Sequence, residues 1–252
     1  MDHQSSDSQI ARYIDLIFDT FLELRGDRKS GDDRSIIGGL ARLDGYETVV
    51  IGYQQGKPVE TPNVFRPEGY RKCSRLVRLA EAFGKPVIIL TDVREVHTLA
   101  VSEQQQVNAA LSLNLEEMCS LMTPIICVIT DEYGGMAANT CAADRFLMMK
   151  DDSCSSPSLG ETSTKTVGDG LAYIKAQHLL ELGIIHRAVD KSGDRESVSH
   201  MIRKAMLEEL DVLTQVHPEV LVQQRLDRLQ YQFLDLRDSQ LLSGNLDETL
   251  EN

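Results

Sequence analysis

Two short, entirely apolar runs, 87–90 and 125–129, constrain the fold of this chain more than any other feature. Each follows a stretch with helical periodicity and a proline, and each is followed by Thr-Asp. Uninterrupted apolar runs are typical of strands that helices cover on both faces. Two consecutive helix–strand units predict right-handed crossovers in a parallel sheet, and ligands bind beyond the carboxyl ends of such strands. We therefore expect the segments that begin with Asp92 and Asp131 to lie side by side at one site.

The second of these strands runs into a turn that contains Gly134 and Gly135, and we expect a helix to begin near Met136. Backbone N–H groups at the start of a helix have no partner inside the helix, so such a turn can hold an oxyanion or a phosphate. A tight turn without any chemistry would also explain the two glycines. The residues alone leave both interpretations open.

The rest of the pattern predicts an α/β fold with a hairpin ahead of the parallel strands. Asp44-Gly45 separates two strand-like runs, 36–43 and 46–53, and is the strongest short hairpin signal. Further strands are expected over 145–149 and 184–189. Helices are expected over the periodic stretches 8–24, 67–83, 107–121, 171–182, 198–213 and 218–236.

Two details inside these elements lead to expectations about packing. Gly38 and Gly39, in the first strand of the hairpin, indicate a bulge or a close approach of another backbone. The helix expected over 67–83 has an apolar face, so its basic residues are assigned to the outer turns: Arg71, Lys72, Arg75 and Arg78.

At 252 residues the chain fits one α/β domain, which we expect over 1–237, followed by a disordered acidic tail over 238–252. The net charge of −13 argues against a nucleic-acid partner, which would need a basic surface. No apolar run approaches the roughly 20 residues that span a bilayer, and the N-terminus lacks a secretion signal, so we expect no membrane partner and a cytoplasmic location. The five cysteines form no C-x-x-C pair and the histidines lack ligand spacing, so no metal site is expected.

Two loops carry basic residues that could meet an anionic ligand. The first, 25–34, mixes both charges densely, a pattern more common in solvated loops than in binding loops. The second, 56–67, is long for a compact domain, and such loops are often functional. Its Lys57 and Arg66, with Arg71-Lys72 in the helix that follows, favour the binding of an anionic ligand or carrier.

The first third of the chain also carries a series of motifs similar to those of one enzyme family. They are FLELRGDR over 21–28, Asp32-Asp33, GGLA over 38–41, PEGYRK over 67–72 and AEAF over 80–83. In order and spacing they resemble the carboxyltransferase alpha subunit of bacterial acetyl-coenzyme A carboxylase. The resemblance is dense to about Asp92 and extends to about residue 235. It implies a crotonase-like (ClpP-like) ββα spiral, with helices flanking the sheets and further helices at the C-terminus.

Members of that family act as alpha–beta heterotetramers and move a carboxyl group from carboxybiotin, on a carrier protein, to acetyl-coenzyme A. The product, malonyl-coenzyme A, feeds fatty acid biosynthesis. The resemblance therefore implies a hetero-oligomer with a beta-type subunit, served by a biotin carboxyl carrier protein. Carboxybiotin and an acyl thioester, on coenzyme A or an acyl carrier protein, would be substrates, with no tightly bound cofactor. The implied site residues are the backbone of Gly134, Gly135 and Met136 as an oxyanion hole, and Lys57, Arg66, Arg71, Lys72 and Asp92 for substrate binding.

The glycine-rich turns of the family are altered in this chain. After the first apolar strand only Asp92 matches, and 93–99 contains none of the family's glycines. After the second strand Gly135 matches, but Met136 stands where the family has glycine. His97, in the first altered turn, could act as a general acid or base, although a solvated loop residue is the simpler interpretation.

Three hypotheses follow from this mixture of matches and departures. The chain is a working carboxyltransferase subunit, a malonyl-thioester decarboxylase that needs no biotin, or a non-catalytic structural partner of a beta-type subunit.

Overall fold

The computed structural model of the chain describes residues 8–54, 65–92, 101–130, 142–150, 152–155 and 173–243. The strands of the described segments are β1 (Thr20–Glu23), β2 (Ile36–Leu43), β3 (Tyr46–Tyr53), β4 (Val87–Thr91), β5 (Ile125–Ile129), β6 (Arg145–Met149), β7 (Ser153–Ser155), β8 (Tyr173–Lys175) and β9 (Arg187–Val189). The helices are α1 (Gln9–Ile17), α2 (Pro67–Phe83), α3 (Val101–Ser120), α4 (Ala176–Glu181), α5 (Arg195–Leu213) and α6 (Pro218–Ser243).

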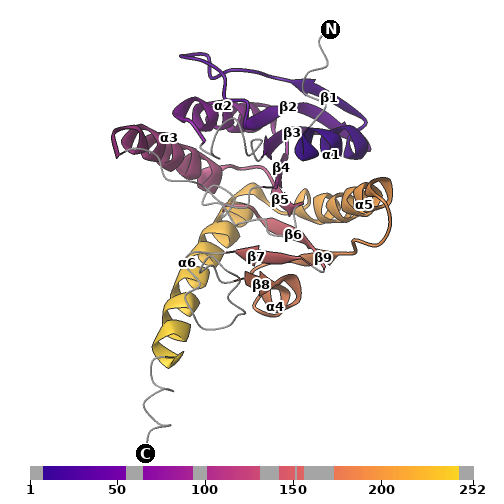
Figure 1. Cartoon of the computed structure of the whole chain (residues 1–252), viewed down its shortest axis with the longest axis vertical. Coiled ribbons are helices and arrows are strands. Elements are labelled where there is room, and N and C mark those ends of the chain that lie inside the picture. The colour runs from indigo at the N-terminus through magenta and orange to yellow at the C-terminus, as the bar shows by residue number, and fades with distance from the viewer. Residues whose placement is uncertain are drawn as a thin grey trace, which may run out of the picture.

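One sheet organises these elements, with strand order β1-β2-β3-β4-β5-β6-β9. The strands from β3 to β9 pair in parallel, whereas β1, β2 and β3 pair antiparallel. Figure 1 shows α2 and α3 on one side of the sheet and α1 and α5 on the other. Every residue of β4 and β5 is buried, because a helical layer covers each face. The predicted parallel sheet is confirmed.

The predicted hairpin is confirmed over its full length. β2 and β3 pair from Ile36↔Tyr53 to Leu43↔Tyr46, and the two turn residues have positive φ angles, 48° at Asp44 and 87° at Gly45. Such a turn matches the twist of the two strands.

The helix predicted over 67–83 is also confirmed. Its apolar face is buried, and it ends at Gly84, whose left-handed φ of 61° closes the last turn. Gly69 sits where a Cβ atom would lie 2.5 Å from Asp33 Oδ2, so this helix packs tightly against the loop before β2.

The helix predicted over 8–24 is shorter than expected. Ser8 caps α1, but the helix ends at Ile17, and residues 20–23 form the edge strand β1. The apolar spacing of this stretch fitted both structures, and pairing with β2 decides between them. Gly39 makes that pairing possible, since a Cβ atom there would lie 2.0 Å from the carbonyl oxygen of Leu22.

Three further boundaries differ from the predictions. Helix α3 begins at Val101 rather than near 107, and α6 continues to Ser243 rather than ending near 236. Residues 173–175 form β8 where a helix was expected, because they pair with β7. The division into a domain over 1–237 and a tail stays a prediction. Within the segments that the structure describes, no helix is both long and apolar enough to cross a bilayer.

A buried ion pair that the sequence did not reveal joins α6 to the sheet. Arg225, fully buried, holds Asp144 through two bonds, Nε–Oδ1 at 2.9 Å and Nη2–Oδ2 at 2.7 Å. The guanidinium also donates to the carbonyl oxygens of Met118, Leu121 and Thr123. These bonds connect the end of α3 and the starts of β5 and β6 to one side chain.

The close approach at Gly39 yields a stability prediction. Gly39→Ala should lower the free energy of unfolding by about 1–3 kcal/mol, because the new methyl group must displace the β1 backbone rather than a mobile side chain. Urea denaturation followed by circular dichroism measures the change. Gly31→Ala is the matched control, since nothing lies within 4 Å of a Cβ atom there. Equal stability of the two variants would contradict the close packing of β1 on β2.

Candidate functional site

The carboxyl ends of three parallel strands meet at one edge of the sheet. Tyr53 pairs with Thr91 and Thr91 pairs with Ile129 in the strand registers. Just past the strand ends, Asp92 N donates to Tyr53 O at 3.2 Å, and Thr130 N donates to Thr91 O at 2.9 Å. The two chain segments that leave these strands therefore start side by side, as predicted.

Thr130, the residue that precedes the glycine turn, is anchored by its side chain as well as by its backbone. Its Oγ1 donates to the same carbonyl oxygen of Thr91 at 3.1 Å, inside a region where Thr130 is only 2% exposed. Its own carbonyl oxygen accepts from Gln9 Nε2 at 3.3 Å. Gln9 lies in the first turn of α1, so a helix distant in sequence supports the start of the turn. Nothing in the sequence pattern distinguished Gln9 for this position.

Several predicted site residues lie outside the described residues. These are Lys57, His97, Gly134, Gly135 and Met136. Their assigned roles stay predictions.

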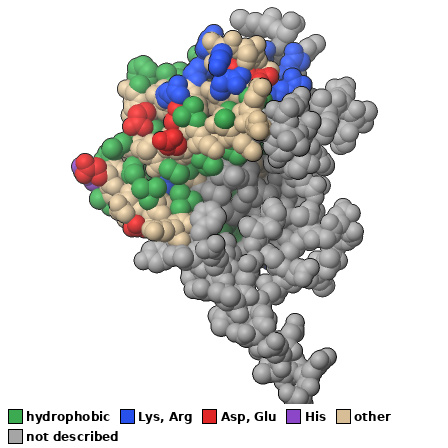
Figure 2. All heavy atoms as spheres, turned by 90° about the vertical axis from the view of Figure 1, so that its left-hand side faces the viewer, with side chains coloured by type: hydrophobic (Ala, Val, Ile, Leu, Met, Phe, Trp, Pro, Cys, Tyr) green, Lys and Arg blue, Asp and Glu red, His purple; other side chains and the backbone are tan. Residues whose placement is uncertain are grey.

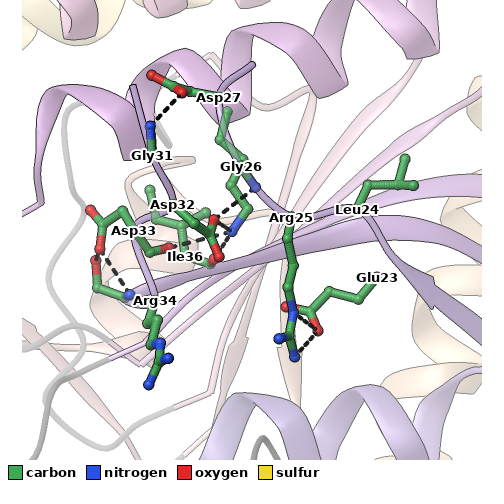
Figure 3. Close-up of polar contacts among 12 residues, drawn as sticks. Glu23, Leu24, Arg25, Gly26, Asp27, Gly31, Asp32, Asp33, Arg34 and Ile36 are labelled. Carbon is green, nitrogen blue, oxygen red and sulfur yellow. Dashed lines mark hydrogen bonds and ion pairs between the residues drawn. The ribbon is translucent and has the colours of Figure 1, made fainter. Parts of the chain in front are cut away.

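The charged loop, which with its flanking residues spans 24–35 between β1 and β2, reaches the same edge of the sheet. It does so because β2 begins at Ile36 opposite the end of β3. Figure 3 shows its carboxylates turned toward the loop backbone. Asp27 accepts from the backbone N–H groups of Lys29, Ser30 and Gly31 at 2.8–3.0 Å. The loop therefore has an ordered polar interior, which differs from the solvated loop that the charge pattern favoured.

Asp27 and Asp33 connect this loop to the start of α2. Asp27 Oδ2 accepts from Arg71 Nε at 2.8 Å, and Arg71 Nη2 also donates to Ser30 Oγ at 2.7 Å. Asp33 Oδ2 accepts from the backbone N–H of Arg66 at 2.8 Å. Arg71 therefore orders the loop, and its role in substrate binding stays a prediction.

Lys72 corrects a prediction more sharply. It was assigned to an outer turn of the helix and to substrate binding, but its side chain is fully buried. Its Nζ donates to Asp32 Oδ1 at 2.6 Å, Ile36 O at 2.7 Å and Asp33 O at 3.3 Å. An ammonium group has three hydrogens to donate, so these acceptors leave none for a ligand. The helical wheel placed Lys72 outside because it could not include the loop that packs over α2.

The remaining predicted binding residues keep positions near the site. Arg66 is exposed at the residue before α2, and Asp92 is 6% exposed at the end of β4. Both lie at the carboxyl edge of the sheet, so their binding roles stay predictions. In the described part of the chain, no three His, Cys, Asp or Glu side chains cluster closely enough to hold a metal ion.

The geometry of Asp27 perturbs its ionisation. Burial acts to raise the pKa of Asp27, but the backbone N–H groups of Gly31, Ser30 and Lys29, together with Arg71, outweigh it and hold the pKa far below its usual range. The carboxylate is therefore ionised at every pH at which the fold is expected to persist.

Comparison with known proteins agrees with this architecture. The model of the acetyl co-enzyme A carboxylase carboxyltransferase-like family matches residues 3–232, nearly the whole chain. The chain belongs to this family. Among its relatives, the acetyl-coenzyme A carboxylase carboxyl transferase subunit alpha of Methylococcus capsulatus is 36% identical over 236 residues, which cover 86% of this chain and 74% of that protein.

Solved structures support the fold of this family member. A Pseudomonas malonate decarboxylase hetero-tetramer in complex with coenzyme A contains a chain that matches with a TM-score of 0.65 at 15% identity, covering 94% of this chain and 99% of that one. Enoyl-CoA hydratase from Bacillus halodurans matches with a TM-score of 0.52 at 11% identity, covering 80% and 92%. The predicted crotonase-like fold is confirmed.

The pKa of Asp27 yields a prediction with a defined pH dependence. Asp27→Asn should lower the free energy of unfolding by about 2 kcal/mol at pH 7, because charge-assisted bonds to the loop are lost. A lowered folded-state pKa means that the stabilisation is present above the unfolded value of about 4 and disappears as the pH falls further. The difference in stability between the two proteins should therefore begin to shrink as the pH falls below about 4 and should continue to shrink toward the folded-state pKa.

Urea denaturation between neutral and acidic pH measures this difference. Asp15→Asn, at an exposed position of α1, is the control and should match the wild type throughout. A deficit for Asp27→Asn that stays constant down to low pH would contradict the role of its charge.

Proposed function

We propose that this chain is the alpha-type component of a carboxyltransferase that transfers a carboxyl group from carboxybiotin, on a carrier protein, to acetyl-coenzyme A or a related acyl thioester. The observation that carries the proposal is the family match over residues 3–232. Its crotonase-like fold brings the ends of β4 and β5 together at the edge where ligands of such sheets bind.

In the proposed reaction the α-carbon of the thioester loses a proton, and the enolate attacks the carboxyl carbon of carboxybiotin. The bond from that carbon to the ureido nitrogen breaks, its electron pair returns to the ureido group, and the ureido nitrogen ends with the proton that the α-carbon released. Negative charge develops on the thioester oxygen and on the ureido oxygen. Donors fixed at those oxygens lower the barrier without any side-chain nucleophile.

The proposed donors are the backbone N–H groups of Gly134, Gly135 and Met136. Replacement of a glycine by Met136 does not remove an N–H group, and a negative φ would allow that residue. Support comes from Thr130, whose bonds to Thr91 and Gln9 hold the start of this segment in place. Arg66 and Asp92, at the same edge, are proposed to contact substrate, together with Lys57.

A beta-type subunit is the proposed partner, in a hetero-oligomer that a biotin carboxyl carrier protein serves. Relatives named alpha subunit support this partnership, because the name implies a complementary subunit. Fatty acid biosynthesis is the corresponding proposed pathway.

Biotin-independent decarboxylation of a malonyl thioester is the second candidate function. It is supported by the segment 93–99, which lacks glycines and so presents backbone N–H groups less readily than the family's turn. Decarboxylation needs one enolate oxyanion to be held, whereas carboxyl transfer needs an additional site for the ureido oxygen.

The deciding experiment is co-expression with a candidate beta-type subunit, followed by assays with malonyl thioesters, with and without free biotin. Carboxyl transfer that depends on biotin would support the proposal. Loss of carbon dioxide without biotin would favour the second candidate. A stable complex with neither activity would mean that the chain is a structural partner.

A change within the turn tests the proposed oxyanion hole. Gly135→Val should lower kcat at least about 100-fold, because the branched side chain would move the backbone N–H of the turn away from the oxyanion, and loss of one oxyanion donor costs about that much. The secondary structure and the assembly with the beta-type subunit, measured by circular dichroism and size-exclusion chromatography, should be unchanged. Unchanged turnover in this variant would overturn the assignment.

The anchor of the turn gives a second, independent prediction. Thr130→Val keeps the shape of the side chain and the backbone bond to Thr91 but removes the hydroxyl donor. We expect kcat to fall about tenfold with little change in KM, since the turn is displaced while the binding groups remain. Thr130→Ser should restore most of the rate. A rise in KM with kcat unchanged, and no rescue by serine, would contradict a positioning role.

A further inference from the structure

Loop 24–35 exposes all four of its cations but buries two of its three carboxylates. In sequence it carries four cations and three carboxylates and is close to neutral. In the structure Asp27 and Asp33 are buried, and Asp32, which is exposed, pairs with the buried Lys72. The nearly neutral composition of the loop therefore does not indicate that its exposed surface is positively charged.

The cations of this loop point outward. Arg25, Arg28, Lys29 and Arg34 are all exposed, and Arg66, held next to Asp33 by its backbone, is exposed beside them. In Figure 3 the side chain of Arg34 extends away from the inward carboxylates. We call the exposed cations of this surface the basic rim: Arg25, Arg28, Lys29, Arg34 and Arg66.

Most of the basic rim is not neutralised by the residues that the structure describes. Arg25 pairs with Glu23. Arg28, Lys29, Arg34 and Arg66 make no ion pair with any other residue that the structure describes. Figure 2 shows Lys and Arg side chains gathered at the top of this face of the molecule, above acidic and hydrophobic side chains. A patch of this kind on a chain of net charge −13 attracts a negatively charged partner to one place.

The position of the rim connects it to the candidate site. Ile36, directly after the loop, pairs with Tyr53 at the carboxyl end of β3. The rim therefore borders the edge of the sheet from which the segments after β4 and β5 depart. A partner docked there would be beside the site rather than on a remote face.

The interior of the loop argues against a phosphate as the natural ligand of the rim. Successive backbone N–H groups can cradle a phosphate, but those of Lys29, Ser30 and Gly31 already bind the carboxylate of Asp27. Only separate, long side chains remain on the outer surface. Such an arrangement fits several carboxylates spread over a protein surface better than one compact phosphate group.

We propose that the basic rim docks the acidic face of a carrier protein that bears the acyl thioester, so that this thioester reaches the site attached to a protein. The inference rests on the proposed function and specifies its substrate. It assigns recognition of the carrier to Arg28, Lys29 and Arg34, which have no proposed role in the chemistry at the turn, and to Arg66, which borders the site.

The test measures binding rather than turnover, using the full chain assembled with its beta-type subunit. The probes are a fluorescently labelled acyl carrier protein with its phosphopantetheine arm, free coenzyme A, a biotin carboxyl carrier protein and a short RNA. Arg28→Ala, Lys29→Ala and Arg34→Ala combined should weaken the affinity for the acyl carrier protein about tenfold or more and leave that for coenzyme A unchanged. Wild-type binding of the carrier should weaken with added salt, because exposed charges are screened.

A matched pair of single substitutions separates the rim from overall charge. Lys29→Glu and Lys204→Glu change the net charge equally, and both lysines are exposed, but Lys204 lies on α5. Only Lys29→Glu should weaken carrier binding. Equal effects of the two, an equal loss of coenzyme A binding, or tighter binding of RNA or of the biotin carrier than of the acyl carrier would each overturn the inference. If carrier binding follows the prediction while no carboxyl transfer or decarboxylation occurs, the proposed reaction fails and the docking surface stands.

Discussion

The buried pair between Arg225 and Asp144 is the interaction on which the arrangement of the sheet most depends. Asp144 also accepts the backbone N–H of Ile125 at 2.7 Å, so one carboxylate joins the starts of β5 and β6. Arg225 occupies the carbonyl oxygens left open at the end of α3, which a helix cannot satisfy by itself. Removal of either partner would leave a buried charge uncompensated, which typically costs about 3–5 kcal/mol.

A second buried cation also joins a helix to neighbouring chain segments, at the opposite edge of the sheet. Lys72 ties α2 to the loop before β2, through Asp32 and two backbone carbonyl oxygens. Because this edge also holds the ends of β3, β4 and β5, the loop is ordered where the site is expected. Order in the loop buries Asp27 and Asp33, and the exposed cations around them form the basic rim. The same loop thus contains the structural ion pair between Lys72 and Asp32 and carries the proposed docking surface.

The sequence predicted a large part of this fold because its signals were local. The hairpin around Asp44-Gly45, the helix closed by Gly84 and the apolar strand β5 were all predicted within a residue or two. The prediction that the first helix continues to residue 24 was wrong, because the four-residue edge strand β1 has no periodicity that distinguishes it from the end of a helix. The sequence correctly predicted that the segments after β4 and β5 start side by side, whereas the glycine turn itself lies outside the described residues.

The sequence by itself determined the order of helices and strands, the parallel sheet and the family, since these follow from local patterns and motif order. Only the tertiary structure decided which charges are buried. Lys72 was expected in solvent and Arg225 was not singled out, yet both are fully buried with every bond directed at distant segments. The reason is physical: a charged side chain leaves water only where acceptors from several chain segments converge, and that convergence exists only in the folded molecule.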